Sequence, residues 1–502
     1  MNYRLVSRYL GHFSGAIGLL MLPSALWAVY FREWDALAAL LGATGVSCLI
    51  GYLFALGGRN ACSDFHQREG LGLVAFSWIV AAGLGALPYM FAGVFTNPAD
   101  AYFESMSGFT TTGASVMTNE FYGVTPKSIM FWRSFTHWLG GMGIVMLFIA
   151  VLPYLGAGGK QLFKSEAPGP DPRGLKPRIR DTASSLYKIY LGITIAQIVA
   201  LMFCGMSLYD ALCHAFGALA TGGFSTKAGS VGAFNSVAVD IVIIVSIIFG
   251  ASNFALYFVV LGGNWKALLK DTEWRFFIAI LAVCTLLVTL NLMGAEGDFA
   301  AGDVPLPAQE KVTYDSFWQA LRYASFQVVS MGTCTGYSTA DFNAWPYFSR
   351  MLLLVLMFVG GCAGSTTGGI KVVRLIILLK MAYARIQQTF RPKMVRAIRV
   401  SGQVVDEGVQ HTVYVFFLLY VFVFVVGSLL MSLLGLPFQT AVSSVAATFN
   451  TAGPGLSAVG AMENYALVPT VGKIFLSLCM VLGRLELFSI MVLFIPSFWR
   501  RG

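Results

Sequence analysis

Charged side chains are scarce in this chain. Asp, Glu, Lys and Arg together make up only 11% of the 502 residues, whereas 57% of the residues are hydrophobic. A soluble protein of this length has too little interior to bury so much apolar side chain, so a soluble globular fold is excluded. The mean hydropathy of +0.72 agrees with this conclusion. The composition therefore predicts a polytopic helical membrane protein.

Cysteine is also sparse, and its eight residues follow no paired spacing. Most of them lie inside apolar runs, where cysteine behaves as a small core residue. This distribution disfavours both a disulfide framework and a cysteine metal site. A nucleophile, a base and an orienting group do not recur at a usable spacing either, so the sequence gives no support for an enzyme.

Basic residues outnumber acidic ones, with a net charge of +9, but nucleic-acid binding is not the best explanation. When the apolar runs are counted alternately in and out, the bases gather in one set of loops, as the positive-inside rule describes. The loops at 160–180 and 380–399 are the most basic, and the opposite loop at 296–315 is acidic. The pattern predicts a multi-pass protein with both termini in the cytoplasm and no nucleic-acid partner.

The first apolar run, about residues 14–30 behind Arg4 and Arg8, imitates a secretory signal. A second apolar run follows at once from Ala36, and no convincing small-residue cleavage site separates the two. We therefore expect a retained helical hairpin over residues 1–62.

Four short glycine-containing loops stand out among the later apolar runs. Each follows a short, mildly polar helix-forming run that cannot cross a bilayer, and each such run lies between two long apolar segments. The loops comprise Thr111, Thr112 and Gly113; Ala220, Thr221 and Gly222; Cys334, Thr335 and Gly336; and Thr451, Ala452 and Gly453. Their glycines recur at intervals of 109, 114 and 117 residues, which indicates one unit repeated four times. The predicted units are 63–160, 161–266, 267–396 and 397–502.

Glycine and small residues suit a loop whose backbone carbonyls all point at a central axis, because glycine tolerates the backbone angles required. Four such loops would form a ring of carbonyl oxygens able to replace the hydration shell of a monovalent cation. The alternative is four outward turns of a duplicated membrane protein without a pore, and repetition in register favours the pore. The predicted fold is all-α: four pseudo-symmetric units of membrane helix, pore loop and membrane helix around one central pore, plus the N-terminal hairpin.

The helices expected within the units follow from the apolar runs and the turn signals. Asp100 and Asp210, which stand 13 and 12 residues before the first two glycines, are predicted to cap short helices. Residues 156–181 are predicted to form a cytoplasmic linker, and residues 397–406 a small hairpin around Ser401 and Gly402. Return helices are expected near 128–155, 236–261, 347 onward and 471–497.

A glycine-rich break interrupts the return helix of the third unit. It comprises Gly360, Gly361, Cys362, Ala363, Gly364, Ser365, Thr366, Thr367, Gly368 and Gly369. No helix favours this composition, and irregular backbone survives at membrane depth only where protein buries it or where it lines water. A polar loop just inside the ring is well placed to act as a gate, with a packing kink as the alternative. The spacing of Gly369 and Lys371, without a preceding strand, does not match a phosphate-binding loop.

Two charges, Arg484 and Glu486, lie inside the last apolar helix, where charge is costly. For Arg484 we favour a barrier role, because a fixed positive charge below the ring repels cations; the alternative is a structural ion pair with a neighbouring helix. Glu486 points to another face and is expected to be an anchor. The residues expected to brace the short helices from behind are Glu104, Arg133, His137 and Arg322.

With these residues in view, the chain resembles the TrkH/KtrB family of potassium transporters. The resemblance covers essentially the whole chain, and the N-terminal hairpin is more similar to TrkH than to the shorter KtrB. The motifs that carry it are Ser107-Gly-Phe-Thr-Thr-Thr-Gly-Ala114, Phe131-Trp-Arg-Ser-Phe-Thr-His-Trp-Leu-Gly-Gly141, Ala220-Thr-Gly-Gly-Phe-Ser225, the break at 360–369, Phe449-Asn-Thr-Ala-Gly-Pro-Gly455 and Gly483-Arg-Leu-Glu486.

This resemblance implies potassium uptake across a bacterial cytoplasmic membrane, through one pore with the glycine-rich break as its gate and Arg484 as its pore arginine. The implied filter glycines are Gly113, Gly222, Gly336 and Gly453. It also implies a homodimer that carries a cytosolic TrkA-like ring of nucleotide-binding regulators, with no cofactor in this chain. The residues after the glycines (Ala114, Gly223, Tyr337 and Pro454) differ, which predicts a less stringent site and leaves rubidium and sodium as further candidate ions.

Two other functions stay open from the sequence. An ion-coupled secondary transporter of another solute also suits a broken helix, but it would have inverted repeats and an acidic midplane site, whereas these repeats share one orientation. The ion-translocating subunit of a pump complex would share the architecture, and a pump subunit encoded beside it would identify that case.

Overall fold

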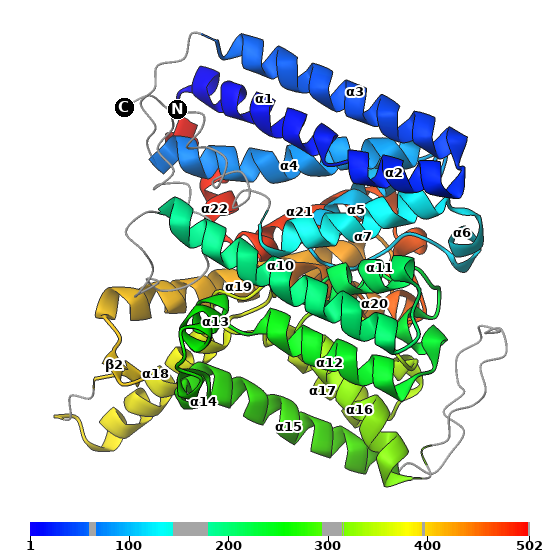
Figure 1. Ribbon diagram of the computed structural model, residues 1–502. Helices are drawn as coiled ribbons and strands as arrows, with labels where there is room; N and C mark the ends of the chain where they lie inside the picture. Colours follow the sequence, from blue (N-terminus) through cyan, green and yellow to red (C-terminus); the bar gives the residue numbers. More distant parts are fainter. Residues whose placement is uncertain (60–66, 144–178, 294–313, 315, 394–396, 500–502) are drawn as a thin grey trace.

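The structure, a computed structural model, describes residues 1–59, 67–143, 179–293, 314, 316–393 and 397–499 (Figure 1). Most of the predicted linker at 156–181, nearly all of the acidic loop at 296–315 and the second half of the helix expected at 128–155 lie outside the described residues.

The N-terminal hairpin forms as predicted and lies along one edge of the molecule (Figure 1). Its first arm is α1 (Tyr3–Leu19) followed by α2 (Leu22–Phe31), and its second arm is α3 (Trp34–Gly57). The arms approach closely, because a Cβ on Gly11 would lie only 2.5 Å from the carbonyl oxygen of Gly51. The hairpin packs against α4 (Gln67–Phe91) of the first unit.

Four units follow, and each contains a long helix, a short buried helix and a return helix. The first unit holds α4, α5 (Pro98–Phe109), α6 (Asn119–Val124) and α7 (Lys127–Gly141). The second holds α10 (Ile179–Phe203), α11 (Leu208–Leu219), η2 (Ser230–Phe234), α12 (Val237–Ala251), α13 (Phe254–Leu261) and α14 (Lys266–Lys270). The third holds α15 (Thr272–Met293), α16 (Phe317–Gly332), η3 (Phe342–Ala344), α17 (Tyr347–Phe358) and α18 (Val372–Phe390). The fourth holds α19 (Glu407–Leu433), α20 (Phe438–Phe449), η4 (Ser457–Val459), η5 (Tyr465–Leu467), α21 (Thr470–Arg484), α22 (Phe488–Met491), η6 (Val492–Phe494) and α23 (Pro496–Trp499).

The predicted caps of the short helices were wrong. The side chain of Asn97 accepts from the backbone at the start of α5, and Ser207 does so at the start of α11. Asp100 and Asp210 instead occupy the third position of each helix, where a carboxylate favourably meets the positive end of the helix dipole. Asp100 also pairs with Lys473 of α21 at 2.6 Å.

Two return helices predicted as continuous are broken. The chain bends by 99° between α12 and α13, where the side chain of Asn253 caps the new helix, and by 119° after α21. At the second break, Glu486 and Leu487 adopt positive φ angles of 54° and 62°. Gly250 and Gly483 lie directly before the two bends, and Asn253 is a typical cap residue, so the sequence carried local signals that the prediction of continuous helices did not use. The break between α17 and α18 was predicted and is confirmed.

The predicted cytoplasmic hairpin is also confirmed as a local structure. Strand β1 (Arg399–Val400) pairs antiparallel with β2 (Gln403–Val404). Ser401 and Gly402 form the turn with φ angles of 49° and 77°, as a two-residue hairpin requires.

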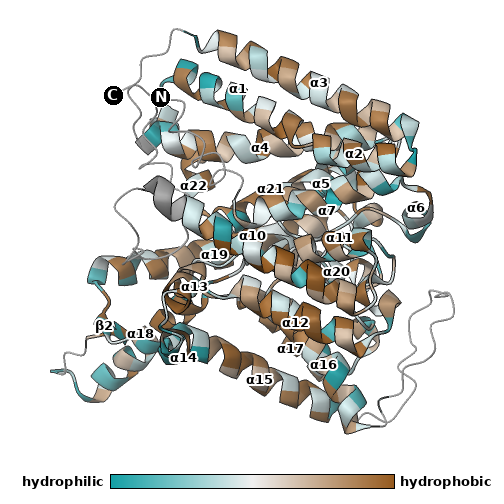
Figure 2. Cartoon of the chain, in the orientation of Figure 1, coloured by the Kyte–Doolittle hydropathy of each residue, from teal (hydrophilic) through white to brown (hydrophobic). Residues whose placement is uncertain are grey.

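Among the described residues, six helices are long and apolar enough to cross a membrane, or up to eight if each bent pair counts as one span. The two most hydrophobic of them are α15 and α19, and most of their residues are not buried inside the protein. Figure 2 shows hydrophobic residues along much of α15, at the lower edge of the view. Lipid is the solvent that such residues require, so the chain is a multi-pass membrane protein.

Candidate functional site

The four short helices end in the same backbone conformation. The residue just beyond each helix cap adopts a left-handed conformation, at Thr111 (φ 54°), Thr221 (φ 53°), Cys334 (φ 53°) and Thr451 (φ 54°). The next amide then bonds back to the helix. These bonds run from Thr112 to Ser107 O (2.9 Å), Gly222 to Gly217 O (2.7 Å), Thr335 to Ser330 O (2.8 Å) and Ala452 to Ala447 O (2.7 Å). The repeat read from the glycines is therefore present in the backbone.

The backbone corrects the predicted register of the second loop by one residue. Glycines at positive φ follow the left-handed residues at Gly113 (80°), Gly223 (82°), Gly336 (86°) and Gly453 (85°). The second unit's equivalent glycine is thus Gly223, and Gly222 matches Thr112. Ala220 is the C-cap residue of α11 and lies outside the loop proper. The sequence prediction matched the units by their Thr-Gly pairs. In the structure the equivalent residues are instead the left-handed ones that follow each short helix, and these make Thr221 equivalent to Thr111.

These loops meet around one axis. Each glycine lies against a carbonyl oxygen of the next loop, and the glycine of the fourth loop lies against a carbonyl oxygen of the first. A Cβ on Gly113 would lie 2.1 Å from Gly222 O, on Gly223 2.2 Å from Thr335 O, on Gly336 2.5 Å from Ala452 O, and on Gly453 2.7 Å from Thr112 O. No side chain fits at such distances, so glycine is required at all four positions. The contacts bring four equivalent carbonyl oxygens together in a closed ring.

Different side chains support the four loops from behind. In the first loop, the hydroxyls of Thr110 and Thr112 lie 2.8 Å apart, and in the third those of Thr333 and Thr335 lie 2.7 Å apart. In the fourth loop the hydroxyl of Tyr420 bonds to Asn450 Oδ1. The second loop has no such pair, because Ala220 and Gly222 carry no hydroxyl.

The expectation that Arg133 and Glu104 brace the loops is confirmed. Arg133 Nε lies 2.6 Å from Glu104 Oε1, and the two side chains are 1% and 0% exposed. The guanidinium also donates to the carbonyl of Ser225 at 3.1 Å, while Glu104 accepts from the amide of Val116 at 2.9 Å. This pair therefore holds the segments that follow the first and second loops. Arg322 instead pairs with Asp240 of α12 at 2.7 Å.

Three supporting residues escaped sequence reasoning. His214 bonds Asp210 O at 2.8 Å and Ser225 Oγ at 3.0 Å. The hydroxyl of Tyr337 donates to the carbonyl of Phe224 at 3.0 Å, and that of Tyr465 donates to the carbonyl of Gly453 at 2.9 Å. Only Tyr337 carried a sequence signal, since it directly follows a loop glycine.

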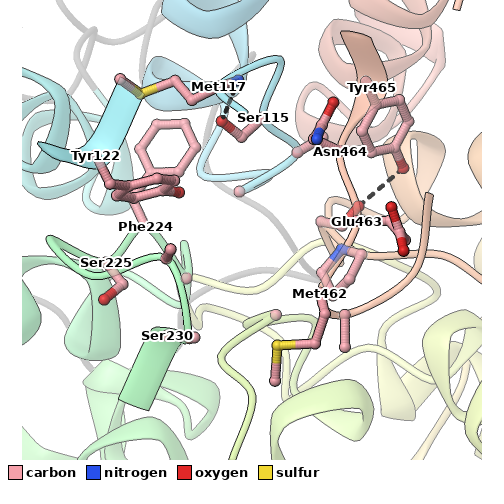
Figure 3. Close-up of a pocket in the computed structure, with 18 of the residues that line it drawn as sticks. Ser115, Met117, Tyr122, Phe224, Ser225, Ser230, Met462, Glu463, Asn464 and Tyr465 are labelled. Atoms are coloured by element: carbon pink, nitrogen blue, oxygen red, sulfur yellow. Dashed lines mark hydrogen bonds between the residues drawn. The ribbon is translucent and has the colours of Figure 1, made fainter. Parts of the chain in front are cut away.

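On the glycine side, the ring opens into a hollow that we call the vestibule. Its lining comes from all four units and includes Ser115, Phe224, Gly336 and Pro454. Figure 3 shows Glu463 and Tyr465 of the fourth unit across the vestibule from Phe224 and Ser225 of the second. Burial raises the pKa of the Glu463 carboxyl, and the nearby Asp341 carboxylate raises it further.

On the opposite side, the glycine-rich break covers the ring. The hydroxyls of Thr366 and Thr221 lie 3.2 Å apart. A Cβ on Gly368 would lie 2.1 Å from Thr451 Oγ1, and one on Gly369 would lie 3.4 Å from Cys334 Sγ. The break therefore lies against the left-handed residues of the second, third and fourth loops.

The break is tied to the rest of the protein by hydrogen bonds from several elements. The amides of Cys362 and Thr366 donate to Ala251 O (2.8 Å) and Gly250 O (3.1 Å), where α12 ends. Glu273, at the start of α15, accepts from the amides of Ala363 at 2.8 Å and Val373 at 3.0 Å. Sequence reasoning missed Glu273, whose only signal was a carboxylate at the first turn of an apolar helix.

Arg484 completes the cover at the first loop. As the last residue of α21, it donates to Thr111 Oγ1 at 3.2 Å, to the carbonyl of Gly141 at 2.8 Å and to the carbonyl of Thr366. It thereby joins the first loop, the end of α7 and the glycine-rich break. Glu486 forms the predicted anchor, as an ion pair with Arg374 of α18.

These features define the class of protein as a membrane protein with four pore-loop units. Four unequal pore-loop units of one chain enclose a ring of backbone oxygens, with a vestibule on one side and a broken helix on the other. The ring that the described residues form is made of oriented backbone oxygens, and such oxygens suit a monovalent cation.

Comparison with known proteins identifies the family. The family model described as TrkH, cation transport protein, matches residues 52–501. The chain is 37% identical to the Trk system potassium uptake protein TrkH of Halomonas elongata and 35% identical to that of Escherichia coli K12, over 100% of each chain. The crystal structure of the potassium transporter TrkH from Vibrio parahaemolyticus matches with a TM-score of 0.86 at 35% identity, over 100% of both chains. The chain belongs to the TrkH family of cation transport proteins.

Proposed function

We propose that this protein carries potassium into the cell through one gated pore, with the four glycine loops as its selectivity filter. The closed ring of loop contacts is the observation that carries this proposal. The filter residues are Thr111, Thr112 and Gly113; Thr221, Gly222 and Gly223; Cys334, Thr335 and Gly336; and Thr451, Ala452 and Gly453. The short helices end at this ring, so the negative ends of their dipoles also favour a cation there. No residue of the chain is assigned a catalytic role.

The glycine-rich break serves as the gate in this proposal, and Arg484 as the charge that makes the closed gate a barrier. The contacts of the break with three loops, and of Arg484 with the first, support this assignment. Opening requires the break to leave the ring, and its irregular backbone can rearrange without unwinding a helix.

The proposal extends to orientation and partners. The vestibule faces outward from a bacterial cytoplasmic membrane, and both termini and the β1–β2 hairpin face the cytoplasm. The chain acts as a homodimer with a cytosolic TrkA-like regulatory ring, which binds the nucleotide, so this chain holds no cofactor. The names of the relatives, which assign them to a Trk system, support an assembly of several components.

Rubidium uptake into liposomes tests the pore. The purified protein should take up rubidium, and potassium should compete better than sodium. Because no side chain fits at either position, Gly113→Asp or Gly336→Asp should push neighbouring loops apart and reduce the preference for potassium by at least about tenfold, which corresponds to about 1.4 kcal/mol in discrimination. Gly83→Ala is the matched control, because nothing lies within 4 Å of its added Cβ. Ion preference that survives both aspartate substitutions would contradict the filter.

A further inference from the structure

His137 is a buried polar residue that forms none of the hydrogen bonds supporting the ring. It lies on α7, one helical turn after Arg133, and its side chain is 0% exposed. Neither ring nitrogen has a hydrogen-bond partner within the described part of the chain. A buried, unsatisfied polar group costs about 1–3 kcal/mol, so an apolar ring of the same shape would stabilise the fold better. The imidazole therefore needs an explanation other than stability.

Its location gives that explanation. The ring centroid lies 4.1 Å from that of Phe224, just after the second loop. A Cβ on Gly222 would lie 1.5 Å from His137 Nδ1. Gly222 is the position equivalent to Thr112 and Thr335, whose side chains support the first and third loops. The imidazole, supplied by the first unit, thus occupies the space that a threonine side chain would take in the second.

We propose that His137 is a specificity-determining residue of the pore, which replaces the missing threonine pair of the second loop and sets how well the ring discriminates among cations. This inference rests on the proposed function. His137 acts by positioning the backbone and does not touch the ion itself.

The effect reaches the ring through Gly222. Its carbonyl oxygen lies against Gly113 of the first loop, where a Cβ added to Gly113 would lie only 2.1 Å from it. A movement of Gly222 toward the space behind the loop changes the distance between the first two loops. Since replacement of a hydration shell depends on the positions of the oxygens, such a movement alters ion preference.

An exchange of side chains tests the proposal. Gly222→Thr alone should abolish rubidium uptake, because the added atoms meet the imidazole. His137→Ala should retain uptake but lower the preference for potassium over sodium by about tenfold, equivalent to about 1.4 kcal/mol. The triple variant His137→Ala, Ala220→Thr, Gly222→Thr rebuilds the hydroxyl pair of the first and third loops. It should recover uptake and most of the lost preference.

Leu139→Ala is the control, since Leu139 is buried in the same helix two positions after His137, which places it on another face of the helix. It should lower thermal stability and leave ion preference unchanged. The inference is overturned if His137→Ala also lowers only the stability, or if the triple variant transports no better than Gly222→Thr. The parent protein separates the two proposals. If the parent shows no rubidium uptake that potassium inhibits, the pore itself is rejected. If the parent is selective and His137→Ala has the same preference for potassium over sodium, only the role of His137 is rejected.

Discussion

Individual residues at the ring adopt conformations that their chemistry disfavours. Thr111, Thr221 and Thr451 are β-branched, yet all three have positive φ angles, which are rare for such residues. Strain of this kind costs on the order of 1–3 kcal/mol per residue and persists only where the surrounding structure enforces it. Here it turns the chain sharply at the helix end and brings each loop to the axis. Strain at equivalent positions is what a site under a functional constraint shows.

Arg484 gives a prediction at this scale. Arg484→Ala should raise basal rubidium uptake by at least about tenfold. At an effective dielectric constant of 20, a unit charge about 4 Å away opposes a cation by about 4 kcal/mol, which is roughly a thousandfold in rate, and a third of that barrier already gives about tenfold. Arg484→Lys is the control: it keeps the charge but loses the forked donor that reaches several carbonyls, so uptake should stay low. Flux into liposomes measures both variants. Parental flux in Arg484→Ala would mean that the side chain is only structural.

Among the elements, the broken return helices matter most. The α12–α13 bend presents the carbonyls of Gly250 and Ala251 to the glycine-rich break, and the bend after α21 places Arg484 at its end. The break itself is held by backbone hydrogen bonds to α12 and by Glu273. The glycine-rich break and Arg484, which cover the ring, are thus held together where three return helices are interrupted: between α12 and α13, between α17 and α18, and after α21.

Gly368 gives a prediction for this element. Gly368→Ala should raise basal rubidium uptake several-fold, because its Cβ would lie 2.1 Å from Thr451 Oγ1 and 2.5 Å from Asn450 O, which forces the break away from the fourth loop. Gly192→Ala, in α10 with nothing within 4 Å of the added Cβ, should behave as the parent. The flux assay without regulator decides the outcome, and an equally closed Gly368→Ala variant would argue against a gate.

At the scale of the whole molecule, polar contacts fasten each unit to the next. Arg133 reaches from the first unit to Ser225 in the second. Three ion pairs continue the series: Asp240 with Arg322, Arg374 with Glu486, and Lys473 with Asp100. They join the second unit to the third, the third to the fourth and the fourth to the first. The closed ring of loops is therefore surrounded by a closed series of contacts between units.

The burial of these pairs predicts their contributions to stability. Arg133→Met should lower the free energy of unfolding by about 3–5 kcal/mol, because it leaves the Glu104 charge buried and unpaired. Lys473→Met should cost only about 1 kcal/mol, since the charge that it leaves behind, Asp100, is 24% exposed and stays partly solvated. Thermal unfolding in detergent compares the two variants. Equal losses would mean that burial does not determine the strength of these contacts.

Much of this protein followed from local sequence. Its composition required a membrane environment, and the glycine loops, the Ser401–Gly402 turn and the break at 360–369 each depend on backbone preferences that neighbouring residues determine. The resemblance carried by six motifs pointed to the family that the comparisons identify.

Only the tertiary structure decided the rest. It selected Gly223 over Gly222 at the ring, placed the ends of α12 and α21 against the glycine-rich break, and set His137 behind the second loop. Each of these depends on contacts between segments far apart in the chain, some more than a hundred residues. The caps at Asn97 and Ser207 are local bonds, which the prediction missed because Asp100 and Asp210 lie nearby and are also cap-forming residues. The sequence by itself determined which segments turn and which cross the membrane; the packing of four unequal units determined which atoms face one another.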